Sequence, residues 1–348
     1  MSLDLVREAA LGRAFDAEPL PDSLADCHVP FSALVGEDVE GDLTARLERY
    51  GRVGVVGPVG AGKSSLVRYV LRADAFAPIF VNVATEDPVK VRDPRAFLEV
   101  LVAQLARTAA RAAALPEEER AALLRAGMRA ETLPGRDVRR GAEFGVWAWV
   151  LRSKLASELT TILPPDEVYA TTDQMREAAQ AALRAIAAHG QVPVLVADDT
   201  DRLLRMPDEK LSARLFTGFF GEVLRMIVDT LEAGLVVAVH ERYRDEPEHA
   251  YDALVEGRIE HHLEIPRLTE AEQLGLIVGA RARFIVPDAD WENLLEPAAL
   301  AELLALHRGA HERSLRRTLA VLKSALGLAE ADRSEHVRAQ HVDAAEAG

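Results

Sequence analysis

The chain has 348 residues, of which 49% are hydrophobic and 28% charged, a composition typical of a globular protein with one large or two modest domains. Its formal net charge of −15 argues against a general electrostatic attraction to nucleic acid, and a single cysteine, Cys27, excludes an internal disulfide bond. No apolar run approaches the roughly 20 residues that cross a bilayer and no secretory leader is present, so we expect a cytoplasmic protein without membrane contact.

The N-terminal segment predicts an arm followed by the first elements of a core. Residues 1–30 combine a short helix with three prolines and little further periodicity, so they predict an arm or linker. An amphipathic helix is predicted over 38–50. The apolar run 53–56 then predicts a buried strand.

A phosphate-binding motif follows this strand. Residues 57–64 read Gly-Pro-Val-Gly-Ala-Gly-Lys-Ser, and the run 66–71 after them predicts a helix. Glycines let backbone N–H groups turn toward phosphate oxygens, and a helix N-terminus favours an anion. Lys63 would reach the β- and γ-phosphates, and the Ser64 hydroxyl would ligate Mg²⁺. The predicted nucleotide-binding residues of the loop are Gly57, Pro58, Val59, Gly60, Ala61, Gly62, Lys63, Ser64 and Ser65.

A second buried strand is predicted over 79–84, and a mostly helical stretch follows from 95 to 190. This stretch is long for a simple crossover between parallel strands, so its part at about 105–190 predicts an inserted helical subdomain. The insertion holds one of two local arginine clusters, each of which forms either a solvated helix face or a nucleic-acid contact. The clusters are Arg129, Arg136, Arg139 and Arg140, and Arg308, Arg313, Arg316 and Arg317.

Acidic residues directly follow the third predicted strand, residues 192–197. A carboxylate at the end of a buried strand beside a phosphate loop suits Mg²⁺, so Asp198 is the predicted metal ligand together with Ser64. Asp199 is predicted to orient or deprotonate a water aimed at the γ-phosphate. The alternative is that Asp199 and Asp201 cap the next helix.

The rest of the chain alternates helices and strands and then becomes helical. Apolar strands separated by helices predict an α/β fold with a parallel sheet covered on both faces. From residue 269 onward only helices are predicted, and they open with a capping box between Thr269 and Glu272. The predicted elements after Asp199 are helices at 208–233 and 247–256, strands at 235–240 and 260–265, and helices near 270–284, 297–307, 312–329 and 335–346.

These motifs, in this order, resemble the AAA+/STAND branch of P-loop ATPases, and within it the origin-recognition/Cdc6-like group. The resemblance spans roughly 31–329, with 105–190 unmatched. The run Asp198-Asp199-Thr200-Asp201-Arg202 also resembles the Asp-Asp-x-Asp-Arg pattern of KAP-type P-loop ATPases. Four segments carry the resemblance: 34–38 as the entry motif, 57–64 as Walker A, 195–199 as Walker B and 309–317 as the sensor 2 region.

The resemblance implies a domain division and further site residues. It predicts an arm (1–30), a P-loop α/β domain (31–266) and a C-terminal helical lid domain (267–348). The backbone of Val35 and Gly36 would lie near adenine. His240 would be the sensor 1 residue, although a histidine at a strand end can instead bond to the backbone. Arg313 is the predicted sensor 2 residue, with Arg316 next.

The resemblance also implies an activity. Arg258 is the predicted arginine finger for a neighbouring subunit, with Arg242 and Arg244 as competitors. Walker B usually ends in Asp-Glu, so the Asp198–Asp199 pair implies slow, switch-like hydrolysis. Because no Asn-Lys-x-Asp element specifies GTP, the predicted cofactors are ATP and Mg²⁺.

We therefore predict an ATP-binding and hydrolysing molecular switch or remodeller that forms homo-oligomers or binds a partner protein, and that acts on a protein or nucleic-acid client. Two alternatives are a regulatory adaptor that binds ATP with little hydrolysis, and a DNA-associated ATPase of a mobile-element or phage-defence module.

Overall fold

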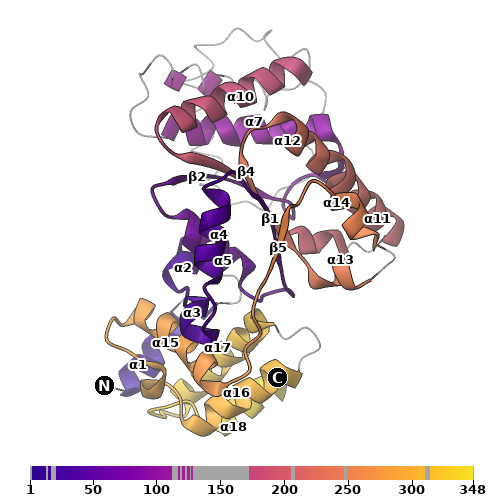
Figure 1. Ribbon diagram of the computed structural model, residues 1–348. Coiled ribbons are helices and arrows are strands. Elements are labelled where there is room, and N and C mark those ends of the chain that lie inside the picture. Colours follow the sequence, from indigo (N-terminus) through magenta and orange to yellow (C-terminus); the bar gives the residue numbers. More distant parts are fainter. Residues whose placement is uncertain are drawn as a thin grey trace, which may run out of the picture.

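In the computed structural model, five parallel strands form one sheet in the order β2-β3-β4-β1-β5. The predicted α/β fold with a parallel sheet is therefore confirmed, and Figure 1 shows helices on both sides of this sheet. The strands are β1 (Arg52–Val56), β2 (Phe76–Asn82), β3 (Val192–Asp198), β4 (Gly234–Val239) and β5 (His261–Glu264). The structure describes residues 2–12, 15–16, 21–111, 117, 120–121, 124–125, 127, 172–204, 208–246, 249–309 and 314–347.

Neighbouring residues of β3 show how both faces of the sheet are covered. Side chains alternate between the faces along a strand. Val194 and Val196 join one apolar core, and Leu195 and Ala197 join another on the opposite face. The first core includes α3 (Phe31–Val35), α4 (Val39–Leu47) and α5 (Lys63–Leu71), and the second includes α7 (Pro94–Arg111), α10 (Thr172–Ala188), α12 (Leu224–Thr230) and α14 (Tyr251–Val255).

The β2 strand begins and ends earlier than the predicted range 79–84. It pairs with β3 from Phe76 onward, and because β2 is the edge strand of the sheet, Pro78 is tolerated within it. At its other end the Asn82 side-chain oxygen accepts a hydrogen bond from the Ala84 N–H at 2.9 Å. This turn ends the strand and leaves Asn82 at the carboxyl edge of the sheet.

The predicted helix at 208–233 is divided by a wide helical turn. It consists of α11 (Glu209–Thr217), the π-helical turn η2 (Gly218–Val223) and α12. A Cβ atom at Gly218 would lie 2.6 Å from the Cβ of Arg92 in α6 (Pro88–Arg92), so glycine permits this close contact. The periodicity of the sequence identified the helix but not the wider turn within it.

The C-terminal helices form a separate apolar core below the sheet in Figure 1. This lid consists of α15 (Ala271–Ile285), η4 (Trp291–Asn293), α16 (Pro297–Gly309), α17 (Leu315–Ala331) and α18 (Ala339–Ala347). The capping box that opens it is formed by Glu270 and Gln273 rather than by Thr269 and Glu272. The predicted box was wrong by one position, because Gln273 accepts hydrogen bonds from the N–H groups of both Thr269 and Glu270.

The N-terminal arm begins in the lid. Helix α1 (Ser2–Leu11) buries Leu5 and Val6 in the same core as α17, and Figure 1 shows it among the C-terminal helices. Lys323 of α17 donates a 2.7 Å hydrogen bond to the Gly12 carbonyl and forms an ion pair with Asp16. Helix α2 (Pro21–Asp26) then packs against α5, so the arm reaches from the lid to the α/β core.

The predicted helical insertion lies largely outside the described residues. Its beginning belongs to α7 and its end to α10, and both helices pack on the sheet. Among the described helices, none combines the length and apolar character required to span a lipid bilayer.

The parallel sheet determines where the motifs meet. The carboxyl ends of parallel strands lie at one edge, where open α/β sheets bind ligands. Gly57 follows β1, and His240 follows β4. Asn82 ends β2 opposite Asp198, which ends β3. Residues far apart in the sequence therefore come together at this edge.

Candidate functional site

The phosphate-loop residues line a cavity of about 830 Å³, a volume within the usual range of small-molecule sites. Gly60 and Gly62 have φ angles of 73° and 103°, a left-handed conformation that favours glycine. Gly62 is the N-cap of α5, and the first turn of this helix lines the cavity. The loop thus combines a curved backbone with a helix N-terminus, an arrangement suited to an anion.

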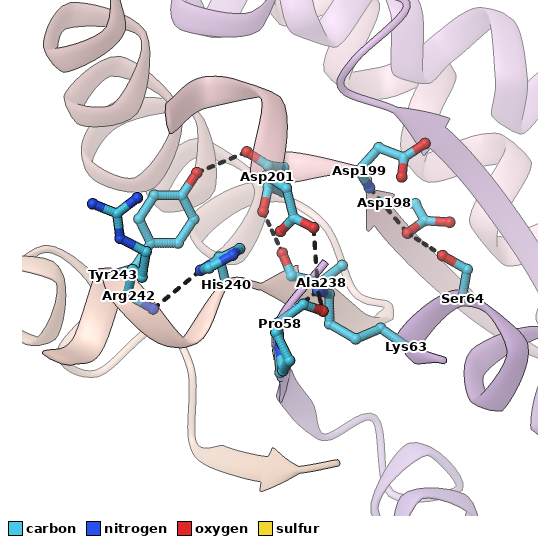
Figure 2. Close-up of polar contacts among 12 residues, drawn as sticks. Pro58, Lys63, Ser64, Asp198, Asp199, Asp201, Ala238, His240, Arg242 and Tyr243 are labelled. Atoms are coloured by element: carbon cyan, nitrogen blue, oxygen red, sulfur yellow. Dashed lines mark hydrogen bonds and ion pairs between the residues drawn. The ribbon is translucent and has the colours of Figure 1, made fainter. Parts of the chain in front are cut away.

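The Lys63 side chain folds back over its own loop. Its side chain is only 6% exposed, and Nζ donates hydrogen bonds to the carbonyl oxygens of Gly57 at 2.8 Å and Pro58 at 2.9 Å. Nζ also lies 3.2 Å from Oδ2 of Asp201, as Figure 2 shows. A positively charged group therefore lies in the wall of the cavity with a carboxylate beside it.

Ser64 and Asp198 are in direct contact across the cavity. Ser64 Oγ donates a 2.9 Å hydrogen bond to Asp198 Oδ1, and the Asp199 N–H donates to the same oxygen at 2.9 Å (Figure 2). Burial raises the pKa of Asp198, the negative charge of Asp199 adds to this, and the Ser64 hydrogen bond partly opposes it. A buried carboxylate beside another carboxylate favours a cation.

The Ser64–Asp198 pair fits a Mg²⁺ ion. Mg²⁺ is commonly held by one or two protein oxygens together with waters and substrate phosphates. A hydroxyl and a carboxylate beside a phosphate loop provide this donor set. Within the described ranges, no cluster of three or more His, Cys, Asp or Glu residues forms a separate metal site.

Asp199 is held in an unusual conformation next to this pair. Its φ is 56°, which is uncommon for a residue with a side chain, and Asn82 Nδ2 donates a 2.7 Å hydrogen bond to its Oδ2. The sequence did not single out Asn82, because only the strand register brings the end of β2 to Asp199. The predicted water-orienting carboxylate thus has a direct partner from the neighbouring strand.

His240 is buried at the end of β4 and caps α13 (Glu241–Asp245). Its Nδ1 accepts a hydrogen bond from the Arg242 N–H at 3.1 Å, so Nε2 carries the proton of the neutral ring. This bond is the one expected from the alternative interpretation of His240, in which a histidine at a strand end bonds to the backbone. Figure 2 shows this bond, and His240 is not among the residues that line the cavity, whereas Asp201 is.

The arm and the lid contribute further lining residues of the cavity. Val35 and Gly36, predicted near adenine, are not among the lining residues, although Leu34 is. The arm contributes Leu24, Cys27, His28 and Val29 instead, α3 contributes Phe31 as well as Leu34, and the lid contributes Ile277, Arg281, His307, Leu315, Arg316 and Leu319. The arm residues carry no recognisable motif, so their place in the cavity could not be predicted from the sequence.

Ser65 connects the arm to the phosphate-loop helix. Its Oγ donates a 2.7 Å hydrogen bond to the Leu24 carbonyl and lies 3.2 Å from His28 Nδ1. His28 Nε2 in turn lies 2.7 Å from Glu40 Oε1 in α4. Burial lowers the pKa of His28, and the Glu40 contact opposes this shift. The Ser65 side chain therefore holds the arm against α5.

The lid meets the phosphate loop at the start of α17. Ser314 is the N-cap of this helix, and both Ser314 and Arg316 lie against Gly60. Arg316 also lines the cavity. Arg313, the predicted sensor 2 residue, lies outside the described residues, as do Arg129, Arg136, Arg139 and Arg140. Arg316, the second choice from the sequence, is therefore the lid arginine that the structure brings to the loop.

The three candidates for the arginine finger are engaged within the chain. Arg258 Nη1 donates hydrogen bonds to the carbonyl oxygens of Phe220, at 3.3 Å, and Leu254. Arg242 and Arg244 form ion pairs with Glu246 and Glu264, respectively. Since Arg258 precedes β5, it lies toward the amino end of the parallel strands, away from the cavity at their carboxyl ends.

Comparison with known proteins supports the fold. The structure is similar to that of the Aeropyrum pernix ORC2 protein in its ADPNP–ADP complexes, with a TM-score of 0.50 and 16% sequence identity over 96% of this chain and 70% of that one. Its ADP form aligns with a TM-score of 0.44 and 16% identity over 88% and 67% of the two chains. No protein-family model and no curated protein matches the chain. The predicted resemblance to origin-recognition ATPases is thus confirmed at the level of the fold.

The contact between Gly60 and the lid predicts unequal effects of two alanine substitutions. A Cβ at Gly60 would lie 2.5 Å from Ser314 Oγ and 2.7 Å from the Arg316 Cβ, whereas a Cβ at Gly62 has no such neighbour within 4 Å. Both Gly60→Ala and Gly62→Ala are expected to lower the free energy of unfolding by about 1 kcal/mol through backbone strain. Gly60→Ala should lower it further because the lid must shift. Urea unfolding measures both variants, and equal losses would contradict a closed contact between lid and loop.

Proposed function

We propose that the cavity binds ATP with Mg²⁺ and that the chain is an ATP-dependent molecular switch. The observation that carries this proposal is the meeting of Lys63, Ser64 and Asp198 at the carboxyl edge of the sheet. Together they offer an ammonium group for phosphates and two oxygen ligands for a metal ion. The similar Aeropyrum pernix protein was solved in ADPNP–ADP complexes, which supports a nucleotide in the corresponding fold.

Each group has a defined task in the proposed reaction. The loop N–H groups and Lys63 would bind the β- and γ-phosphates, and Ser64 with Asp198 would hold the ion. Mg²⁺, when bound, supplies positive charge to the phosphate oxygens. Asp199, which lines the cavity, would orient the attacking water. Arg316 would join the phosphates from the lid and take the sensor 2 role predicted for Arg313.

The contacts of the lid suggest how the nucleotide controls the shape of the protein. Ser314 and Arg316 lie against Gly60 of the phosphate loop, and the loop and other lid residues line the same cavity. A nucleotide between these surfaces would therefore set the angle of the lid, and release of the γ-phosphate would reset it.

Substitution of Lys63 tests nucleotide binding directly. Lys63→Met is expected to weaken binding of a fluorescent ATP analogue in the presence of Mg²⁺ by tenfold or more, because hydrogen bonds to charged groups contribute roughly 1.5–3 kcal/mol. Lys210→Met, at an exposed position of α11, is the matched control and should leave the dissociation constant unchanged. Equal affinities of Lys63→Met and the wild type would remove the basis of the proposal.

The contact between Asn82 and Asp199 favours a second candidate, an adaptor that binds ATP with little hydrolysis. A carboxylate that accepts a 2.7 Å hydrogen bond from Asn82 is less available to orient a water. In this case the bound nucleotide rather than its hydrolysis would determine the interaction with a partner protein.

Release of Asp199 from Asn82 distinguishes the two candidates. Asn82→Ala is expected to raise the rate of ATP hydrolysis severalfold, because it frees the Asp199 carboxylate, and Asp199→Asn should abolish hydrolysis while ATP still binds. Asn293→Ala, at an exposed position of the lid that does not line the cavity, serves as the control. A wild type and an Asn82→Ala variant that both bind ATP without turnover would favour the adaptor.

We also propose that ATP promotes assembly into oligomers. The position of Arg258 toward the amino ends of the strands suits an action on a neighbouring subunit rather than on its own cavity. Light scattering of the protein with ADPNP and Mg²⁺ should show a higher mass than the nucleotide-free protein, and Arg258→Ala should assemble without stimulated hydrolysis. A mass independent of nucleotide at all protein concentrations would contradict the assembly.

A further inference from the structure

Asp201 is a third carboxylate of the site, and the proposed reaction does not use it. Its Oδ2 lies 3.2 Å from Lys63 Nζ, and its side chain is 16% exposed. Its second oxygen, Oδ1, is buried and accepts no hydrogen bond from the described part of the chain. Among the described residues that contact Lys63 Nζ, Asp201 is the only charged partner, since the other two acceptors are backbone carbonyls.

The position of Asp201 is fixed by residues around it. Asp201 belongs to the 3-10 helix η1 (Thr200–Leu204), which starts directly after the left-handed residue Asp199. Thr200 is fully buried, and its hydroxyl donates a hydrogen bond to the Ala238 carbonyl of β4. The Thr200 carbonyl accepts a 2.7 Å hydrogen bond from the Tyr243 hydroxyl of α13. Two separate elements therefore hold η1 where its carboxylate meets Lys63.

The three partners of Lys63 use all of its donors. A lysine ammonium has three N–H groups, and here they face Gly57, Pro58 and Asp201. A phosphate oxygen that binds to this ammonium must replace one of the three. The carboxylate is the partner it would displace, because Asp201 lies on a different element from the loop, and because two anions repel each other beside one cation.

We propose that Asp201 positions Lys63 in the nucleotide-free protein and competes with the phosphates for it. Asp201 is then a residue that sets nucleotide affinity rather than a catalytic residue. A single phosphate gains too few contacts to displace it, whereas a nucleotide with Mg²⁺ also gains the loop amides, Ser64 and Asp198. This inference rests on the proposed nucleotide site and adds a selection for polyphosphates to it.

Removal of the negative charge tests the competition. Asp201→Asn keeps the size of the side chain and should tighten binding of a fluorescent ADP analogue about tenfold, and it should make inorganic phosphate a measurable competitor. Asp229→Asn, on the exposed side of α12, is the matched control. In a Lys63→Met background, Asp201→Asn should give no such gain, because the contested ammonium is absent.

The result separates this inference from the proposed function. If the wild type binds nucleotide and a folded Asp201→Asn binds it no more tightly, the inference is wrong while the proposed function stands. Loss of hydrolysis in Asp201→Asn at unchanged affinity would overturn the inference too, because it would identify a catalytic group. If the wild type binds no nucleotide, the proposed function fails together with the inference.

A second measurement without nucleotide examines the contact itself. Thermal unfolding of the wild type, Lys63→Met, Asp201→Asn and the double variant forms a double-mutant cycle. The melting temperatures should show coupling: each substitution should lower the melting temperature less when the partner residue has already been replaced than it does in the wild type. Additive shifts would show that Lys63 and Asp201 do not interact in the empty protein, and would overturn the inference whatever the nucleotide data.

Discussion

The burial of the Lys63 ammonium is the constraint on which the site depends. A buried charge is costly unless nearby groups accept hydrogen bonds from it. The phosphate loop provides two carbonyl acceptors, and η1 provides a carboxylate. For these three groups to converge, the loop must fold back over Lys63, β3 must end beside it, and η1 must be anchored to β4. The same arrangement leaves a cation where phosphates would enter.

Three nearby aspartates have different surroundings and therefore suit different roles. Asp198 is buried and contacts the Ser64 hydroxyl, so the two side chains together suit a metal ion. Asp199 adopts a left-handed conformation and is held by Asn82. Asp201 faces the lysine. The run Asp198-Asp199-Thr200-Asp201 thus sends its carboxylates in three directions because Asp199 reverses the local backbone and Thr200 fixes the turn.

The sequence predicted the parts of this structure that depend on local patterns. Apolar runs identified β1, β3, β4 and β5 to within a few residues, and the glycine spacing identified the phosphate loop. Contacts that depend on strand register could not be predicted, such as that between Asn82 and Asp199. The pairing of Lys63 with Asp201 was also missed, because it requires the end of β3 to lie near the loop after β1 across an intervening strand. The arm residues that line the cavity have no periodicity, and no local pattern marks the π-helical turn that begins at Gly218, where the chain lies close to Arg92.

The contact of the lid with Gly60 has a consequence for the speed of ligand capture. Ser314 and Arg316 lie against the loop, while arm residues line the same cavity and contact Ser65. A nucleotide that binds in this cavity, as proposed, would contact α17 as well as the loop, so its entry would depend on movement of the lid and diffusion alone would not set the association rate. Association rates fall when a conformational change must accompany binding. Capture and release would then share one barrier, the opening of the lid, and residence time would depend on the packing between α17 and the loop as much as on the phosphate contacts.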